Sequence, residues 1–327
     1  MSINKQPPFY TLHISLADTM SFTAPLKTRS SKGTTTTHPT IKRRQTLKRN
    51  RSRVSSVRRP TSSTTVSPIR RSTITHGALA RWASTLSHWT QWTRTTPQPA
   101  KELISHLIRH YIQTATECPR TRIRAIQYRL SGSMASVWNT TLTQTQRRSL
   151  PLTIRDGLID ERRHSCVVDF ANKHVGGHYL TGGFVQEEKL VWERTDLAAL
   201  LTKGYADQCP YTMGPREAWV FRGLRKWASC QMYGTIPADW RSQTHVYPGS
   251  GATTTTPATR PLAILAMDAL PHRSPDTPYS RPHLQWLVTK AYIGFRAARC
   301  EGYRTIATGN WGCGMFGNRP EVMLWVQ

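Results

Sequence analysis

The sequence predicts an α/β protein, and three observations lead to that class. Short apolar runs typical of buried strands occur at 166–168, 218–221 and 262–267. Segments with an apolar residue at every third or fourth position, typical of helices, alternate with these runs. Glycine-rich stretches follow two of the strands, and ligands in α/β folds bind at strand ends.

The first 75 residues differ in composition from the rest of the chain. They contain fifteen Lys or Arg and one acidic residue, Asp18, with few apolar side chains. Such a segment buries too little apolar surface to offset the entropy of ordering, so we expect residues 1–75 to form a disordered basic tail. Nine basic residues lie between Lys42 and Arg59. This cluster is typical of a nuclear localisation signal or a nucleic-acid patch, and we expect a nuclear protein, with the cytoplasm as the alternative.

The charge of the chain favours anionic partners. Its formal net charge is +27, with fifteen basic and one acidic residue in the tail and thirty basic and seventeen acidic residues after it. A charge of this size favours polyanions through salt-sensitive association. The tail is expected to contact nucleic acid nonspecifically, and composition leaves open whether any polyanion binding is specific.

Cysteine and hydropathy patterns narrow the remaining classes. Six cysteines are scattered, without a CxxC pair or a Cys/His pair at zinc-ligand spacing. We therefore expect reduced thiols and neither a metal nor a cofactor. Neither a secretory signal nor an apolar run of about 18 residues is found, which predicts a soluble intracellular protein without membrane contact. We expect a monomer.

Residues 76–150 are predicted to form a small helical accessory region. Apolar residues spaced as on one helix face are Leu79, Trp82, Leu86, Trp89 and Trp92. Pro97 and Pro99 separate this helix from a second one over 103–112. A tryptophan row at helical spacing is more often core than binding surface. Alternation over 126–130 predicts a strand.

The chain is organised around Val168 to Leu190, which reads VDFANKHVGGHYLTGGFVQEEKL. Here a strand leads into two glycine pairs and then into a helix that begins at Gln186-Glu187-Glu188. Glycines let a backbone approach a ligand closely, and a helix N-terminus attracts anions. A second glycine-rich stretch, TGNWGCGMFGN, follows a strand at 305–307. Two such stretches predict a site for a phosphate-bearing sugar.

These motifs resemble those of the poly(ADP-ribose) glycohydrolase family, whose signature is a glycine triplet followed by Gln-Glu-Glu. The segments MDAL (267–270), KAYIGF (290–295) and ATGNWGCGMFG (307–317) also fit, in the family's order. The resemblance implies a macrodomain-like mixed sheet flanked by helices over 151–327. It also implies hydrolysis of ribose–ribose O-glycosidic bonds in poly(ADP-ribose), with the polymer and ADP-ribosylated proteins as partners. Reversal of ADP-ribosylation connects such an activity to DNA repair.

The resemblance also implies roles for individual residues. Glu188 is the catalytic residue, acting as acid and then as base, and Glu187 orients ribose hydroxyls. The substrate-binding residues it implies are Asn172 at the distal ribose, with Asp169 and Gln186 in the same motif; Gly176, Gly177, Gly314, Met315 and Phe316 at the diphosphate, with Asn310 in the second glycine stretch; Ile159 and Asp160 at the adenine; and Tyr233 as an aromatic clasp.

Helix geometry supports a single catalytic carboxyl. Neighbouring helix residues point about 100° apart, so Glu187 and Glu188 are not expected to flank one bond as a glycosidase pair does. A helix N-terminus favours the carboxylate form, whereas a general acid must hold its proton near neutral pH. Desolvation by substrate or a neighbouring phosphate can raise the pKa, and the sequence leaves open which of them acts.

Two departures from the family pattern leave alternatives open. His178 occupies the third glycine position, where a side chain is expected to crowd the diphosphate or to strain the backbone. Asn318 and Arg319 follow Gly317 where the family has Gly-Asp, and the chain stops at Gln327, so the domain looks shortened. The first hypothesis is an active glycohydrolase. The others are a catalytically impaired module that binds ADP-ribose or its polymer, and a basic nucleic-acid-binding protein with an inactive macrodomain.

Overall fold

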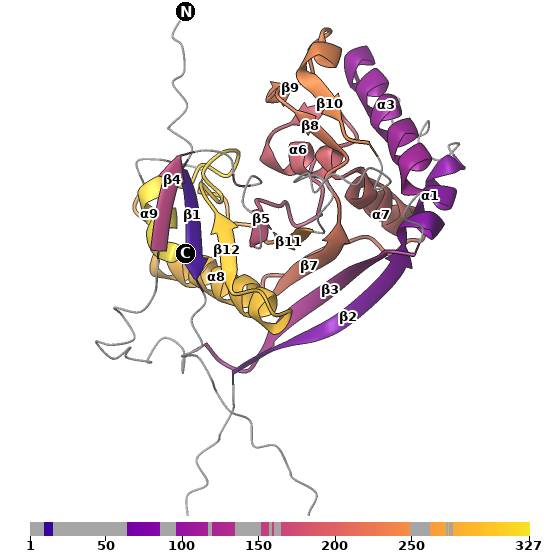
Figure 1. Cartoon of the computed structure of the whole chain (residues 1–327). Coiled ribbons are helices and arrows are strands. Elements are labelled where there is room, and N and C mark those ends of the chain that lie inside the picture. Colours follow the sequence, from indigo (N-terminus) through magenta and orange to yellow (C-terminus); the bar gives the residue numbers. More distant parts are fainter. Residues whose placement is uncertain are drawn as a thin grey trace, which may run out of the picture.

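A computed structural model describes residues 10–15, 64–85, 96–116, 120–134, 152–156, 159, 165–248, 262–272, 274 and 277–327. Within them the main feature is an eight-stranded mixed sheet with the order β2-β3-β7-β11-β5-β12-β1-β4 (Figure 1). Its strands are β1 (Tyr10–Ser15), β2 (Thr65–Thr75), β3 (Arg122–Ser131), β4 (Leu152–Asp156), β5 (Cys166–Asp169), β7 (Glu217–Leu224), β11 (Leu262–Ala266) and β12 (Thr305–Thr308).

The helices and minor strands complete the described elements. The helices are α1 (His76–Ser84), α3 (Gln98–Ala115), α6 (Gln186–Glu193), α7 (Thr195–Ala206), α8 (Arg281–Cys300), α9 (Pro320–Val326) and the 3₁₀ helix η2 (Trp240–Gln243). Two small ribbons pair β6 (Gly183–Phe184) with β9 (Gly234–Thr235) and β8 (Ala228–Cys230) with β10 (Thr244–Val246).

The centre of the sheet places both glycine stretches at one edge. β5 lies between β11 and β12 and is parallel to both. Parallel strands end at the same edge of a sheet, so the chain after Ala266, after Asp169 and after Thr308 leaves from that edge. The sequence prediction of strands that deliver glycine loops to a common site is confirmed.

The sheet separates two cores, as its side-chain alternation requires. On β3, Ile123 and Ala125 join a core with α1, α3, α6 and α7. Ile126 and Tyr128 point the other way, into a core with α8. Figure 1 shows the same arrangement, with α8 and α9 on one face of the sheet and α1, α3, α6 and α7 on the opposite face. A mixed sheet flanked by helices is the predicted class, and it is confirmed.

Two predictions about the N-terminal half are wrong. Residues 10–15 and 65–75 were expected in a disordered tail, but they form β1 and β2 of the main sheet. Composition did not reveal them because pairing within a sheet stabilises strands that contain few apolar residues. β2 pairs with β3 at ten positions. The boundary at 150 also fails as a structural division, because β3 lies in the same sheet as β5.

Helix boundaries follow the apolar patterns. α3 buries the predicted face, with Pro97 at its N-cap and Pro99 in its first turn, where a missing N–H costs nothing. α1 ends at Ser84, with Leu79 fully buried. Leu86, Trp89 and Trp92 of the predicted helix lie outside the described residues, as does the basic cluster 42–59. In the described part of the chain, no helix has the length and hydropathy to span a membrane.

Candidate active site

The site begins where β5 ends. Gln186, the first residue of α6, holds this end: its side-chain oxygen accepts from the Phe170 backbone N–H at 2.9 Å, and its amide donates to the Val168 carbonyl at 3.1 Å. The start of α6 is thereby fixed against the strand end. The residues between them, 170–185, are called the first glycine loop.

The two acids that follow Gln186 hold the backbone of this loop. The Glu187 carboxyl accepts the N–H of Gly176 at 2.6 Å and that of Asn172 at 3.0 Å. The Glu188 carboxyl accepts the N–H of His178 at 2.9 Å and that of Val185 at 3.2 Å. Four backbone donors, from the beginning to the end of the loop, are therefore satisfied by two adjacent side chains.

The glycines are required by this arrangement. Gly176 and Gly177 have φ angles of +106° and +53°, a region that side chains rarely adopt. A Cβ at Gly177 would stand 2.5 Å from a Glu187 oxygen and 2.6 Å from a Glu188 oxygen. Both carboxyl groups therefore converge on Gly177. Each side chain bends toward the loop that it caps; whether the two acids flank one glycosidic bond stays a prediction.

His178 does not strain the loop. Among the described non-glycine residues, positive φ is found at Gln208 alone, so the predicted backbone strain at His178 is wrong. Its backbone supplies the N–H bonded to Glu188, and its side chain is exposed. A third glycine is unnecessary because this position has an ordinary backbone conformation.

Burial gives the acidic cluster unusual proton affinity. Asp169 is fully buried, and neither of its carboxyl oxygens has a hydrogen-bond partner among the described residues. Burial, with the nearby Glu188 charge, raises the pKa of Asp169 to about 8, although Arg194 opposes the shift. Burial and the Asp169 charge raise the pKa of Glu187 well above its ordinary value. Near neutral pH Asp169 therefore retains its proton.

Arg194 is a component that the sequence did not reveal. It is fully buried between α6 and α7, and its guanidinium nitrogens form no hydrogen bond with the described residues. Its nearest acid is Glu193, at 3.9 Å. A buried charge of this kind stabilises the ionised form of neighbouring acids. Only the fold brings it near Asp169, and no motif marks it.

Tyr233 lies beside the Gln-Glu-Glu motif, and its role as an aromatic clasp stays a prediction. Burial, followed by the Glu188 charge, raises the pKa of its phenol, and a hydrogen bond with the Gln186 backbone opposes the shift. The side chain remains 44% exposed. The neighbouring Gly234 pairs with Phe184 of the first glycine loop through the β6–β9 ribbon. Tyr233 is therefore an aromatic group at the rim of the site.

The second glycine loop, residues 309–319, is held by neutral groups. The Asn318 amide donates to the carbonyls of Leu270 and Gly312, both at 3.0 Å. The buried Trp311 ring donates to the Met267 carbonyl at 3.0 Å, and the Phe316 carbonyl accepts from the His272 N–H at 2.7 Å. This loop is thus anchored to the chain that follows β11.

The predicted residues of this loop differ in exposure. Gly314 is exposed and Met315 is 89% exposed, whereas Phe316 is half-buried against the α8 core. The Asn310 side-chain oxygen is buried without a hydrogen-bond partner in the described part of the chain. Gly314 and Met315 are open to a ligand at the sheet edge shared with the first loop.

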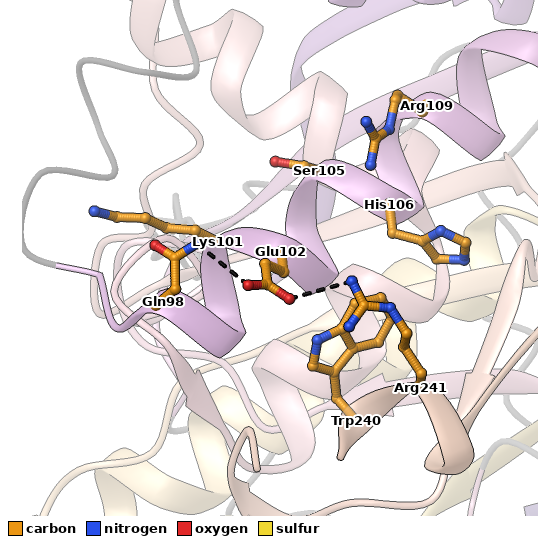
Figure 2. A pocket seen from close by; sticks show the side chains of 8 residues that line it. All are labelled: Gln98, Lys101, Glu102, Ser105, His106, Arg109, Trp240 and Arg241. Carbon is orange, nitrogen blue, oxygen red and sulfur yellow. Dashed lines mark hydrogen bonds and ion pairs between the residues drawn. The ribbon is translucent and has the colours of Figure 1, made fainter. Parts of the chain in front are cut away.

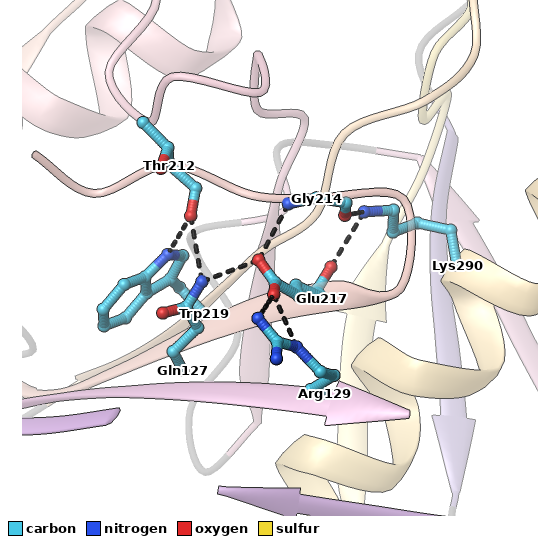
Figure 3. Close-up of polar contacts among 7 residues, drawn as sticks. All are labelled: Gln127, Arg129, Thr212, Gly214, Glu217, Trp219 and Lys290. Atoms are coloured by element: carbon cyan, nitrogen blue, oxygen red, sulfur yellow. Dashed lines mark hydrogen bonds and ion pairs between the residues drawn. The ribbon is translucent and has the colours of Figure 1, made fainter. Parts of the chain in front are cut away.

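A buried ion pair joins two of the family-like segments. Lys290 is fully buried, and its Nζ lies 2.6 Å from Asp268, just after β11. The same Nζ donates to the carbonyls of Gly214 and Glu217 at 2.7 and 2.8 Å. Figure 3 shows that the Glu217 carboxylate, beside the carbonyl that Lys290 binds, accepts hydrogen bonds from the side chains of Gln127 and Arg129. MDAL and KAYIGF thus meet, and this ion pair fixes the chain that supports the second glycine loop.

Ile159 and Asp160 are the residues predicted at the adenine. Ile159 is half-buried and packs against the core on the α6 side. Asp160 lies outside the described residues. Within the described ranges, no group of three or more His, Cys, Asp and Glu is arranged to hold a metal ion.

Comparison with known families agrees with this geometry. Residues 137–327, more than half of the chain, match the sequence model described as poly(ADP-ribose) glycohydrolase, macro domain fold. The chain belongs to this family. The acidic motif, the second glycine loop and strands β4, β5, β7, β11 and β12 lie within the matched residues. Strands β1, β2 and β3 of the same sheet precede them.

Solved structures similar to the chain come from Thermomonospora curvata. A mutant of its poly(ADP-ribose) glycohydrolase is 22% identical, over 50% of this chain and 56% of that chain, with a TM-score of 0.33. The chain thus spans little more than half of that relative. The unmutated enzyme is 18% identical over 77% and 85%, and its complex with the inhibitor ADP-HPD is 16% identical over 77% and 84%, both with TM-scores of 0.33.

Proposed function

We propose that this protein hydrolyses ribose–ribose O-glycosidic bonds of poly(ADP-ribose) and releases ADP-ribose. The observation that carries the proposal is the placement of Glu188, a residue that is 4% exposed and whose carboxyl is hydrogen-bonded to the backbone of a glycine loop. Family membership supports the chemistry. In the glycine loop after β12, at the same sheet edge, Gly314 and Met315 are exposed and can contact a diphosphate.

The surroundings of the two acids support Glu188 as the reacting group. Both acids are buried, and Glu187 accepts from the backbone of the buried Gly176 and the half-buried Asn172. Glu188 contacts the backbone of the exposed His178 and acts electrostatically on the half-exposed Tyr233. These contacts with more exposed residues favour Glu188 as the acid that meets the substrate, with Glu187 positioning the loop through Asn172 and Gly176.

One carboxyl can perform both halves of the reaction. Glu188 donates its proton to the departing ribose oxygen as the C–O bond breaks and an oxocarbenium-like state forms. The resulting carboxylate then removes a proton from the attacking water, which adds to the anomeric carbon and restores the acid. Burial raises the pKa of Asp169 to about 8 and raises that of Glu187, which favours their neutral forms and limits the negative charge around a diphosphate substrate.

The test is a polymer-cleavage assay on wild type, Glu188→Gln and Glu321→Gln. Glu321 is an exposed acid at the start of α9 and serves as the matched control. Loss of the only acid–base group is expected to reduce turnover by about 10³-fold, while Glu321→Gln stays within about twofold of wild type. Thermal unfolding verifies that each variant is folded.

The impaired binding module remains the second function, and the same assay separates the two. Calorimetry with ADP-ribose would show binding by wild type and Glu188→Gln in either case. Wild-type protein that binds ADP-ribose but leaves the polymer intact supports the module. Turnover by Glu188→Gln above about a tenth of wild type contradicts the role of Glu188.

A further inference from the structure

A second concave site lies outside the acidic cluster, between α3 and η2. It is a cavity of about 390 Å³, within the size range of ligand pockets. Figure 2 shows that α3 supplies one wall and Trp240 and Arg241 supply the other. Its lining is mainly polar and basic, and consists of Gln98, Lys101, Glu102, Ser105, His106, Arg109, Trp240 and Arg241.

The groove has a net positive charge, because its basic side chains outnumber its one carboxylate. Glu102 is bound by Gln98 and by Arg241, both at 3.2 Å (Figure 2). The side chains of Lys101 and Arg109 form no hydrogen bond or ion pair with the residues that the structure describes. Three cations against one carboxylate leave a net charge of about +2 in a concave surface, which concentrates anions.

The spacing of the two free cations fits an extended anion. Lys101, Ser105 and Arg109 recur every fourth residue on α3, opposite the face that packs into the core. Eight residues of helix span about 12 Å, so the cations can reach two separate phosphate groups of one chain. Trp240, 2% exposed and covered by His106 at a ring distance of 5.4 Å, forms the floor.

Both walls of the groove are connected to the first glycine loop. Just before α3, Thr96 donates to the Leu180 carbonyl, and a Cβ at Gly182 would stand 3.1 Å from Pro97. The opposite wall follows β9, whose Thr235 pairs with Gly183. The groove therefore starts at the C-terminal end of the loop that Glu188 holds.

We propose that this groove is an accessory substrate site. It binds phosphate-bearing units of a poly(ADP-ribose) chain beyond the unit at the Glu188 site. The inference rests on the proposed function, since it assigns the polymer as occupant. A polymer bound at the Glu188 site and along α3 gains affinity from both contacts, whereas we expect a dimer of ADP-ribose to bind at the Glu188 site alone.

The experiment combines Lys101→Gln and Arg109→Gln, with Arg281→Gln and Arg304→Gln as a control that removes two exposed cations elsewhere. Anisotropy measures binding of a polymer of about 20 units and of the dimer by Glu188→Gln protein carrying each pair. The preference for the polymer over the dimer is expected to fall about tenfold with the groove pair. The slope of log affinity against log salt should fall by about 1.4 for two phosphate contacts.

The control pair is expected to keep the polymer preference within about twofold. The inference is overturned if the groove pair leaves the preference unchanged, or if polymer and dimer lose affinity equally. An equal loss of affinity for RNA of similar length would identify a general polyanion surface and also overturn it. Because binding is measured without turnover, these outcomes are distinct from a failure of the cleavage assay.

Discussion

The two glycine loops lie at one edge of the sheet but are held by different chemistry. Two buried carboxyl groups, on Glu187 and Glu188, hold the first loop through four backbone N–H groups. A neutral amide and an indole, on Asn318 and Trp311, hold the second. The anchors of the first loop change with protonation and can take part in chemistry. Those of the second can only fix a shape.

The largest effect is expected where the first loop touches its anchors. Gly177→Ala places a Cβ 2.5 Å from Glu187 and 2.6 Å from Glu188, at a φ of +53°. We expect a loss of about 3–4 kcal/mol in the free energy of unfolding, from clash and backbone strain together. Polymer cleavage should fall at least a hundredfold.

Gly314→Ala, in the second loop, is the stability control for that substitution. A Cβ there has no neighbour within 4 Å, so urea unfolding should change by less than about 0.5 kcal/mol. If Gly177→Ala and Gly314→Ala lose the same free energy of unfolding, the contact with the anchoring carboxyl groups does not make Gly177 more sensitive than Gly314.

The neutral anchor of the second loop is expected to matter somewhat less. Asn318→Ala leaves the Leu270 and Gly312 carbonyls without its amide, and we expect a cost of about 2–3 kcal/mol. Asn310→Ala is the matched control, because its oxygen has no partner among the described residues. Urea unfolding measures the cost of both substitutions.

The carboxyl cluster should make stability depend on pH. The pKa of Asp169 is about 8 in the folded chain and near 3.8 when unfolded, so the group destabilises the fold increasingly as pH rises between these values. One such proton corresponds to a fall of about 1.4 kcal/mol per pH unit. Asp169→Asn should remove about one proton's worth of this slope between pH 5 and pH 8. If urea unfolding shows the same pH dependence of the free energy of unfolding in wild type and Asp169→Asn, the raised pKa of Asp169 is contradicted.

The smallest effect is expected at His178. Its backbone N–H, which glycine also has, forms the contact with Glu188, and its side chain is exposed. We expect His178→Gly to cost less than about 1 kcal/mol, chiefly through chain entropy, and to leave cleavage within about threefold of wild type. A gain in turnover above tenfold would show that the imidazole obstructs the cleft.

Local pattern was enough to predict several parts of the molecule. Apolar runs identified β5, β7 and β11, and the spacing of Leu103 to Ile112 identified the buried face of α3. The Gln-Glu-Glu motif after a glycine stretch marked the acids. These features depend on residues near one another in sequence, where periodicity and glycine content carry the information.

Other parts depended on contacts between distant segments. The sequence of β1 and β2 resembles a polar tail, and only pairing with β12 and β3 makes them strands. Convergence of both acids on Gly177 required the path of the loop, and the proximity of Arg194 to Asp169 required the packing of two helices.

The sequence by itself therefore determined the α/β class, the central strands and the residues of the acidic motif. The tertiary structure decided which strands join the sheet, what each acid holds and how strongly burial alters its proton affinity. The physical reason is that backbone propensity is local, whereas burial and electrostatic coupling arise only when segments far apart in the chain exclude water together.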